Sequence, residues 1–126
     1  MKNKSIKSII FYIIFVMFIL GCGQKGLQHN IKIKNSTSST IVITSCDMTT
    51  STIFPVEIEA SKETEIIVEG SKESATFYFS VKDKNFMLNT GYIQDEGFIN
   101  IEILEDNSNL TAMKNSEIKA ILVELD

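Results

Sequence analysis

The sequence has no arginine and no tryptophan, and its twelve basic residues, all lysines, are outnumbered by sixteen acidic residues. The formal net charge is −4 at pH 7. Proteins that bind nucleic acid gather lysine and arginine on one face to neutralise phosphates. An acidic chain without arginine is therefore expected to bind neither nucleic acid nor anionic lipid headgroups.

Histidine is also scarce, because His29 is the single histidine of the chain. A Ser/His/Asp or Cys/His catalytic site would need it, and zinc would need a cluster of cysteine and histidine. His29 falls in a short polar stretch with glycines, which we expect to be a flexible, solvated tether. A glycine-rich phosphate-binding motif is also missing. The sequence therefore predicts no catalytic residues, no cofactor and no metal site.

Long apolar runs are missing except near the N-terminus, where Ile9 to Leu20 forms twelve uninterrupted apolar residues. As a helix this run covers about 18 Å, which is short of the roughly 30 Å hydrocarbon core of a bilayer. Three lysines within the first seven residues precede the run, and Gly21-Cys22 follows it. This combination is typical of a secretory signal peptide, here residues 1–21.

The junction Ile19-Leu20-Gly21-Cys22 resembles the lipobox of bacterial lipoproteins. The resemblance implies that the Cys22 sulfur receives a diacylglyceryl group and that the signal peptide is cleaved before Cys22. Fatty acyl chains such as palmitate would then anchor the protein on the cell membrane or the outer membrane, with its domain outside the cytoplasm. Two alternatives stay open: an uncleaved N-terminal membrane anchor, and an ordinary signal peptide that is cut elsewhere.

Loss of the signal peptide changes the charge and the cysteine chemistry. Nine lysines then stand against sixteen acids, a net charge of −7, which favours solubility. With Cys22 lipidated, Cys46 has no partner for an intramolecular disulfide and is expected to be a small buried hydrophobe. Residues 22–30 are predicted to be the lipidated cysteine and tether, and residues 31–126 the folded domain.

From residue 31 onward, apolar and polar residues alternate with period two, which is typical of half-buried β-strands. The clearest case is 75–82, where Phe77, Phe79 and Val81 alternate with polar residues. Strands are predicted to start roughly 9 to 13 residues apart, near 31, 40, 53, 64, 75, 86 and 98. This spacing leaves no room for helical crossovers, so we expect antiparallel pairing. The predicted fold is an all-β, antiparallel β-sandwich of immunoglobulin-like type with about seven or eight strands.

The C-terminal residues 117–125 can be interpreted in two ways. Four apolar residues fit the i, i+3, i+4, i+7 spacing of a helix: Ile118, Ile121, Leu122 and Leu125. Residues 121, 123 and 125 also alternate as in a strand. The β-branched side chains and the all-β context favour a final strand, which follows a predicted polar loop at 105–109.

Tyr78 and Tyr92 are the residues that we expect to face a ligand. Tyr78 falls on the outward face of its predicted strand, where it could stack on a partner, although a second sheet covering this face is the other interpretation. The sequence predicts a non-catalytic binding or structural module whose partner is a protein or an envelope polymer. The alternative is an envelope hydrolase, or an inhibitor of an enzyme, that uses surface carboxylates and needs two acids converging in a cleft.

Overall fold

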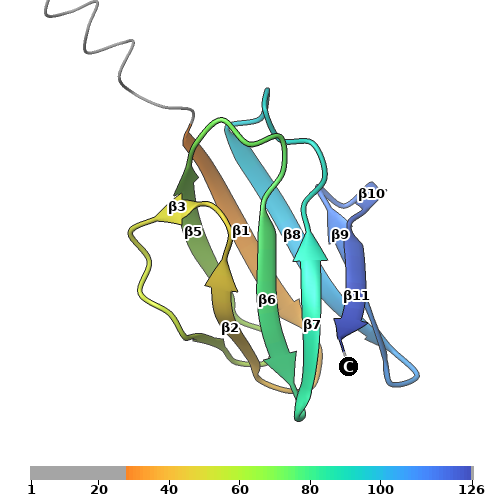
Figure 1. The fold of residues 1–126 in the computed structure, drawn as a ribbon. Coiled ribbons are helices and arrows are strands. Elements are labelled where there is room, and N and C mark those ends of the chain that lie inside the picture. The colour runs from red at the N-terminus through yellow and green to blue at the C-terminus, as the bar shows by residue number, and fades with distance from the viewer. Residues whose placement is uncertain (1–27, 126) are drawn as a thin grey trace, which may run out of the picture.

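The computed structural model describes residues 28–125, which form β-strands joined by turns and loops, without a helix in this part of the chain (Figure 1). Within these residues, no helix has the length and apolar character needed to cross a membrane. The strands in chain order are β1 Gln28–Ser36, β2 Ile41–Cys46, β3 Thr49–Thr50, β4 Val56–Ile58, β5 Glu63–Glu69, β6 Thr76–Val81, β7 Lys84–Asn89, β8 Phe98–Asp106, β9 Asn109–Lys114, β10 Ile118–Lys119 and β11 Ile121–Leu125.

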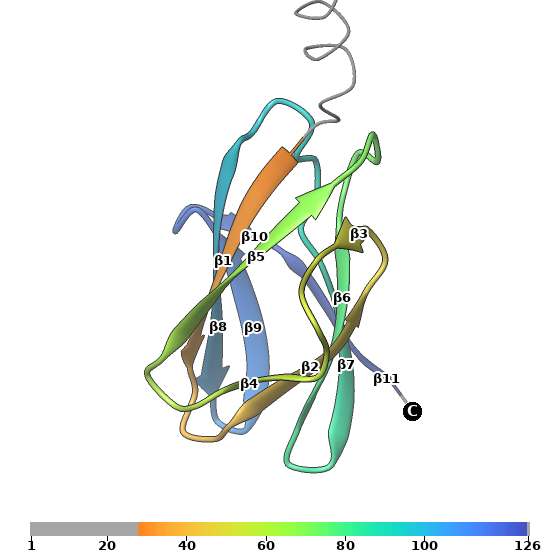
Figure 2. The same cartoon turned by 90° about the vertical axis from the view of Figure 1, so that its left-hand side faces the viewer.

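The strands make two sheets that pack face to face, and the predicted β-sandwich is confirmed (Figure 2). One sheet has six strands in the order β10-β9-β8-β1-β5-β3, and the other has five in the order β11-β7-β6-β2-β4. Alternate residues of each strand point between the sheets and are buried, because the side-chain period of a strand is two. The core is largely isoleucine and phenylalanine, including Ile31, Ile33, Phe77, Phe79, Ile99, Ile101 and Ile103.

Most neighbouring strands are antiparallel, but β1 and β8 pair in parallel, with Ile31 opposite Ile99 and Ile33 opposite Ile101. This pairing departs from the antiparallel arrangement that the short strand spacing predicted. The spacing rule applies to strands that follow one another in the chain, which can be joined by a hairpin. β1 and β8 are separated by six intervening strands, so the rule does not constrain how they pair.

The structure has eleven strands, more than the seven or eight expected, and the additional ones are β3, β9 and β10. The region predicted as a loop at 105–109 accounts for β9. Glu105 and Asp106 belong to the end of β8, and Asn109 begins β9. The two residues between them, Asn107 and Ser108, have φ angles of 49° and 72°. Positive φ at both central residues is the geometry of a two-residue hairpin turn, so the polar stretch closes a hairpin.

The tether predicted at 22–30 is wrong at its C-terminal end, because β1 begins at Gln28. His29 lies in this strand and is 2 % exposed, so it is not the solvated residue that we expected. It continues the inward row of Ile31 and Ile33, and its Nδ1 donates a hydrogen bond to the backbone carbonyl of Glu96. Its Nε2 is buried without a hydrogen-bond partner among the described residues. The signal peptide and Cys22 lie outside the described residues.

The C-terminal residues form strands, as the alternation favoured, and the helical interpretation is wrong. β10 pairs with β9, and the chain then crosses to the other sheet, where β11 pairs antiparallel with β7. In this register Leu122 lies opposite Leu88 and packs against the core. Ile121, Val123 and Leu125 point the other way and are exposed.

The core contacts can be tested at Phe79, which is 2 % exposed and stacks on Phe86 with the ring centroids 5.3 Å apart. We expect Phe79→Ala to lower the free energy of unfolding by about 3–5 kcal/mol, because it removes a buried ring and leaves a cavity. Urea titration of the purified protein measures this loss. The control is Ile53→Ala, since Ile53 is 87 % exposed and should change stability by less than about 0.5 kcal/mol. Equal midpoints for the two variants would contradict the assigned core.

Candidate binding surface

The two outer faces of the sandwich differ in charge, and the outer face of the six-stranded sheet is the charged one. Lys32 and Glu63 form an ion pair with 3.8 Å between Nζ and Oε1, and Lys34 lies 4.0 Å from Glu102. These side chains are about half exposed, with the exception of the more covered Glu102. Exposed pairs of this kind contribute little to stability. This face also exposes two apolar side chains, Ile67 on β5 and Phe98 at the start of β8.

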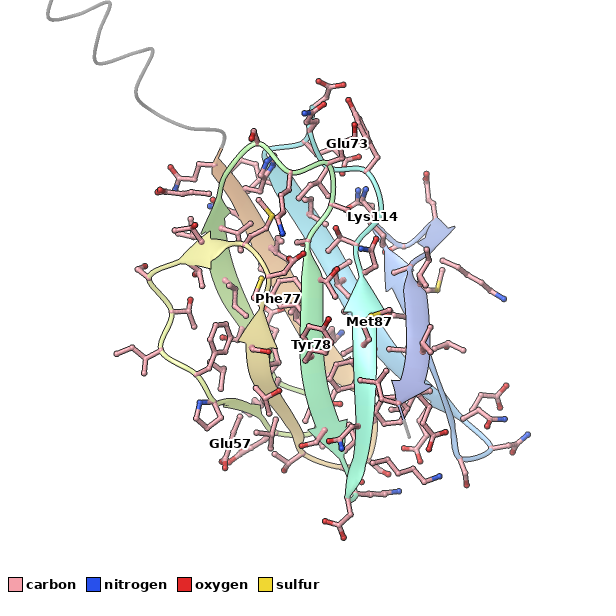
Figure 3. All side chains as sticks on the ribbon, in the orientation of Figure 1. Glu57, Glu73, Phe77, Tyr78, Met87 and Lys114 are labelled. Atoms are coloured by element: carbon pink, nitrogen blue, oxygen red, sulfur yellow. The ribbon has the colours of Figure 1, made fainter. Side chains whose placement is uncertain are left out.

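The outward residues of β11, β7, β6 and β2 in the five-stranded sheet carry no charge, and we call the surface that they form the uncharged face; Glu57 on the edge strand β4 lies at its margin. The strand register places its residues in rows across the sheet, of which the central one is Val123, Met87, Tyr78 and Ser45. Figure 3 shows Tyr78 and Met87 on neighbouring strands of this sheet. The outward residues are Val42, Ser45, Thr76, Tyr78, Ser80, Asn85, Met87, Asn89, Ile121, Val123 and Leu125.

The apolar side chains of the uncharged face are concentrated on β11. Ile121 is 58 % exposed, Val123 is 43 % exposed, and Leu125 and Tyr78 are each 37 % exposed. Single exposed apolar residues are common, but a contiguous apolar patch on a soluble domain is typical of an interaction site. The centres of protein interfaces are poor in charged residues and rich in tyrosine and methionine. The uncharged face has this composition.

A pocket of about 380 Å³ adjoins one end of the uncharged face. Tyr92 lines it from the loop between β7 and β8, and Ile121 lines it from the start of β11. Three charged residues, Glu96, Lys114 and Lys119, also contribute to the lining. Because Ile121 belongs both to the pocket and to the uncharged face, the two form one continuous surface. Tyr92 is 54 % exposed, so its ring is accessible from solvent.

Lys114 fastens the loop that carries Tyr92. Its side chain is 6 % exposed, and its Nζ lies 2.9 Å from a carboxylate oxygen of Glu96. The same ammonium group donates a hydrogen bond to the backbone carbonyl of Tyr92. A buried ammonium needs such partners because it has lost its water. Figure 3 shows Lys114 near the end of the sandwich at which this loop lies.

The start of β1 holds the same loop from the other side. His29 donates to the carbonyl of Glu96, and the amide of Asn30 donates to the carbonyl of Gly97 over 2.8 Å. Ile93 is fully buried, and its amide donates to the carbonyl of Glu73. These contacts fix the loop before any ligand arrives, which lowers the entropic cost of binding.

The chemistry of Tyr92 suits a neutral hydrogen-bonding group. Burial raises the pKa of its hydroxyl above the ordinary value, and the negative charge of Asp95 raises this pKa further. The hydroxyl lies 3.2 Å from a side-chain oxygen of Gln94 and 3.3 Å from one of Asp95, and these two acceptors share its single hydrogen. At neutral pH Tyr92 therefore presents an uncharged ring with a polar tip, as tyrosines at interfaces commonly do.

Tyr78 and Tyr92, the two tyrosines singled out in the sequence, lie on different elements of the same surface. Tyr78 is in the middle of β6, and Tyr92 is in the loop after β7. The apolar residues of β11 connect them, and these residues were not recognised as surface from the sequence. Lys114 was also missed, because a single lysine in an alternating strand carries no sign that it is buried.

Among the carboxylates that the hydrolase alternative could use, Glu105 is held by contacts with neighbouring residues. Hydrogen bonds from the amide and hydroxyl of Ser38, followed by contact with Lys82, lower the pKa of Glu105. A general acid needs a raised pKa. In residues 28–125, no group of three or more histidine, cysteine or acidic side chains is arranged to hold a metal ion. Burial raises the pKa of the Cys46 thiol, which reduces its nucleophilic thiolate form.

Comparison with known proteins adds no further assignment to this surface. No known protein family matches the chain, and no curated protein is similar to it in sequence.

The role of Lys114 can be tested with Lys114→Met, which keeps the aliphatic stem and removes the charge. We expect the free energy of unfolding to fall by about 1–3 kcal/mol, because Glu96 loses its cation in a partly buried site. Hydrogen exchange of the amides in 92–97 should become faster. The matched control is Lys84→Met, which breaks an exposed ion pair with Glu124 and should cost less than about 1 kcal/mol. Unchanged exchange in 92–97 would show that Lys114 does not hold the loop.

Proposed function

We propose that this protein is a non-catalytic binding module, held by lipid on Cys22 at the envelope membrane, that binds a partner through the uncharged face and the Tyr92 pocket. The observation that carries the proposal is the contrast between the two outer faces. One sheet presents ion-paired lysine and glutamate, whereas the outward positions of β11, β7, β6 and β2 carry no charge, and Glu57 on the edge strand β4 is the charged residue at the margin of this face.

The composition of the whole chain makes this contrast meaningful. Charged residues make up 22 % of the sequence, yet the outward positions of β11, β7, β6 and β2 contain none of them. Exposed apolar side chains are unfavourable in water and gain about 25 cal/mol for each Å² that a partner covers. A protein or a neutral envelope polymer is a suitable partner, because neither requires a compensating charge on this surface.

The lipid anchor would place this surface close to the membrane. The chain from Cys22 to Gln28 has six peptide units, which reach about 21 Å when fully extended. The Tyr92 loop contacts the first residues of β1, through the hydrogen bond between Asn30 and Gly97. The pocket therefore lies at the end of the sandwich where β1 begins, which is the end nearest to the proposed anchor.

Lipidation is tested by labelling cells with a radioactive or alkyne-modified fatty acid. We expect the wild-type chain to carry the label and to sediment with membranes, and Cys22→Ala to lose both properties. Two or more acyl chains are needed for firm anchoring, since each buried CH₂ contributes only about 0.8 kcal/mol. Cys46→Ser is the matched control and should keep the label. Equal labelling of wild type and Cys22→Ala would contradict a lipid anchor at this cysteine.

The binding surface is tested by photo-crosslinking in cells that produce the full chain. A photoreactive phenylalanine analogue placed at Tyr78, Met87 or Val123 should form adducts, because these three positions share the central row of the uncharged face. The same analogue at Asn100, on the outer face of the charged sheet, is the control and should form none. Adducts of equal yield on both faces, or on neither, would show that the uncharged face is not the binding surface.

A further inference from the structure

The two sheets have four edges in the part of the chain that the structure describes, and three of them are poor templates for another strand. β3 and β10 have two residues each, and β4 has three residues and directly follows Pro55, which has no amide hydrogen. Short edge strands, proline and charge are the usual means by which proteins prevent edge-to-edge pairing.

The fourth edge, β11, lacks this protection. It has five residues, of which Glu124 is the single charged one, and it contains neither lysine nor proline. One side of β11 is paired with β7, and the other side is the edge of the five-stranded sheet. Its outward side chains, at 121, 123 and 125, are together with Tyr78 the most exposed apolar residues of the uncharged face.

We propose that β11 accepts an extended, uncharged segment of a second protein as an additional strand of the five-stranded sheet. This inference rests on the proposed binding function and specifies the class of partner. The backbone of the segment would pair with the free edge of β11, and its outward side chains would extend the apolar row of Ile121, Val123 and Leu125. In strand addition, backbone hydrogen bonds supply affinity, and pockets for individual side chains supply specificity. The Tyr92 pocket, which shares Ile121 with β11 and is also lined by Lys114 and Lys119, is placed to receive one side chain of the segment.

The length of the chain before β1 argues against a second copy of this protein as the occupant. If the β11 strands of two copies paired antiparallel, their apolar rows would be aligned about Val123. The strands of one copy would then run in the opposite direction to those of the other, so the two copies would begin at opposite ends. For strands that stand upright on the membrane, the start of β1 in the inverted copy would then lie farther from the membrane by at least about the length of β1. β1 has nine residues, which span about 30 Å, whereas the chain from Cys22 to Gln28 reaches about 21 Å.

Parallel pairing of two copies does not solve this problem. Parallel pairing would keep both chain starts at the same end. However, the two copies would be related by a two-fold axis along the strands, so their uncharged faces would point in opposite directions. The two apolar rows would then lie on different faces and would not meet. A segment from another protein has no such restriction, because its attachment to the membrane is independent of this chain.

The test uses the full chain, purified from membranes in detergent, and a defined pool of fluorescent nonapeptides. Valine, isoleucine, leucine or phenylalanine alternates with threonine in these peptides, so that one side of each strand is apolar. We expect saturable binding by fluorescence anisotropy and slower hydrogen exchange of the β11 amides in the complex. Two N-methylated versions of the bound peptides are compared, one methylated at the odd-numbered and one at the even-numbered backbone nitrogens. The version that loses the N–H groups facing β11 should bind about tenfold or more weakly, because hydrogen-bond donors are lost while the side chains are kept.

Two protein variants complete the test. Val123→Lys places a charge on the exposed side of β11 and should weaken peptide binding by about tenfold or more, as edge lysines do in natural sheets. Ile53→Lys adds the same charge at a residue that is 87 % exposed on another part of the surface, and should leave binding unchanged. Strand addition would be overturned if no peptide of the pool bound, or if N-methylation at neither set of alternate nitrogens weakened binding. It would also be overturned if Val123→Lys and Ile53→Lys had equal effects on binding. Photo-crosslinking from Tyr78 and Met87 would still succeed in those cases if the uncharged face binds a partner of another kind.

Discussion

Burial of one side of every long strand is the constraint on which the rest of the structure depends. Isoleucines of β1 and β8 lie side by side in register, and the phenylalanines of β6 face them from the other sheet. Because the side-chain period of a strand is two, placing these residues inside determines which residues point outward. The uncharged face on one sheet and the ion pairs on the other therefore follow from how the core is packed.

The pocket depends on contacts between parts of the chain that are distant in sequence. His29 and Asn30 at the start of β1, and Lys114 at the end of β9, all bind the loop between β7 and β8. Each of these polar groups donates a hydrogen bond to a backbone carbonyl of the loop, and Lys114 also pairs with the carboxylate of Glu96. The loop that carries Tyr92 is thereby fixed relative to the first residue of β11, which makes the pocket and the sheet face one surface.

Alternation in the sequence was sufficient to locate β1, β6 and β8 and to predict a sandwich, because half-buried strands have a strong period-two signal. It was not sufficient where turn geometry decided the outcome. Asn107 and Ser108 adopt positive φ and close a hairpin, so a polar stretch that resembled a loop joins two paired strands. It also failed at His29, because a polar residue in an inward position is buried only if a distant carbonyl accepts its hydrogen bond.

The sequence by itself determined that the domain is a two-layer β structure and that Tyr78 points outward, since both follow from the local period of side chains. Tertiary structure alone decided that Ile121, Val123 and Leu125 lie on the same face as Tyr78, and that Lys114 is buried beside Tyr92. The physical reason is that alternation separates the two sides of a strand but does not assign a strand to a sheet. That assignment depends on pairing between distant strands, and it gave one sheet of this protein a charged outer face and the other an uncharged one.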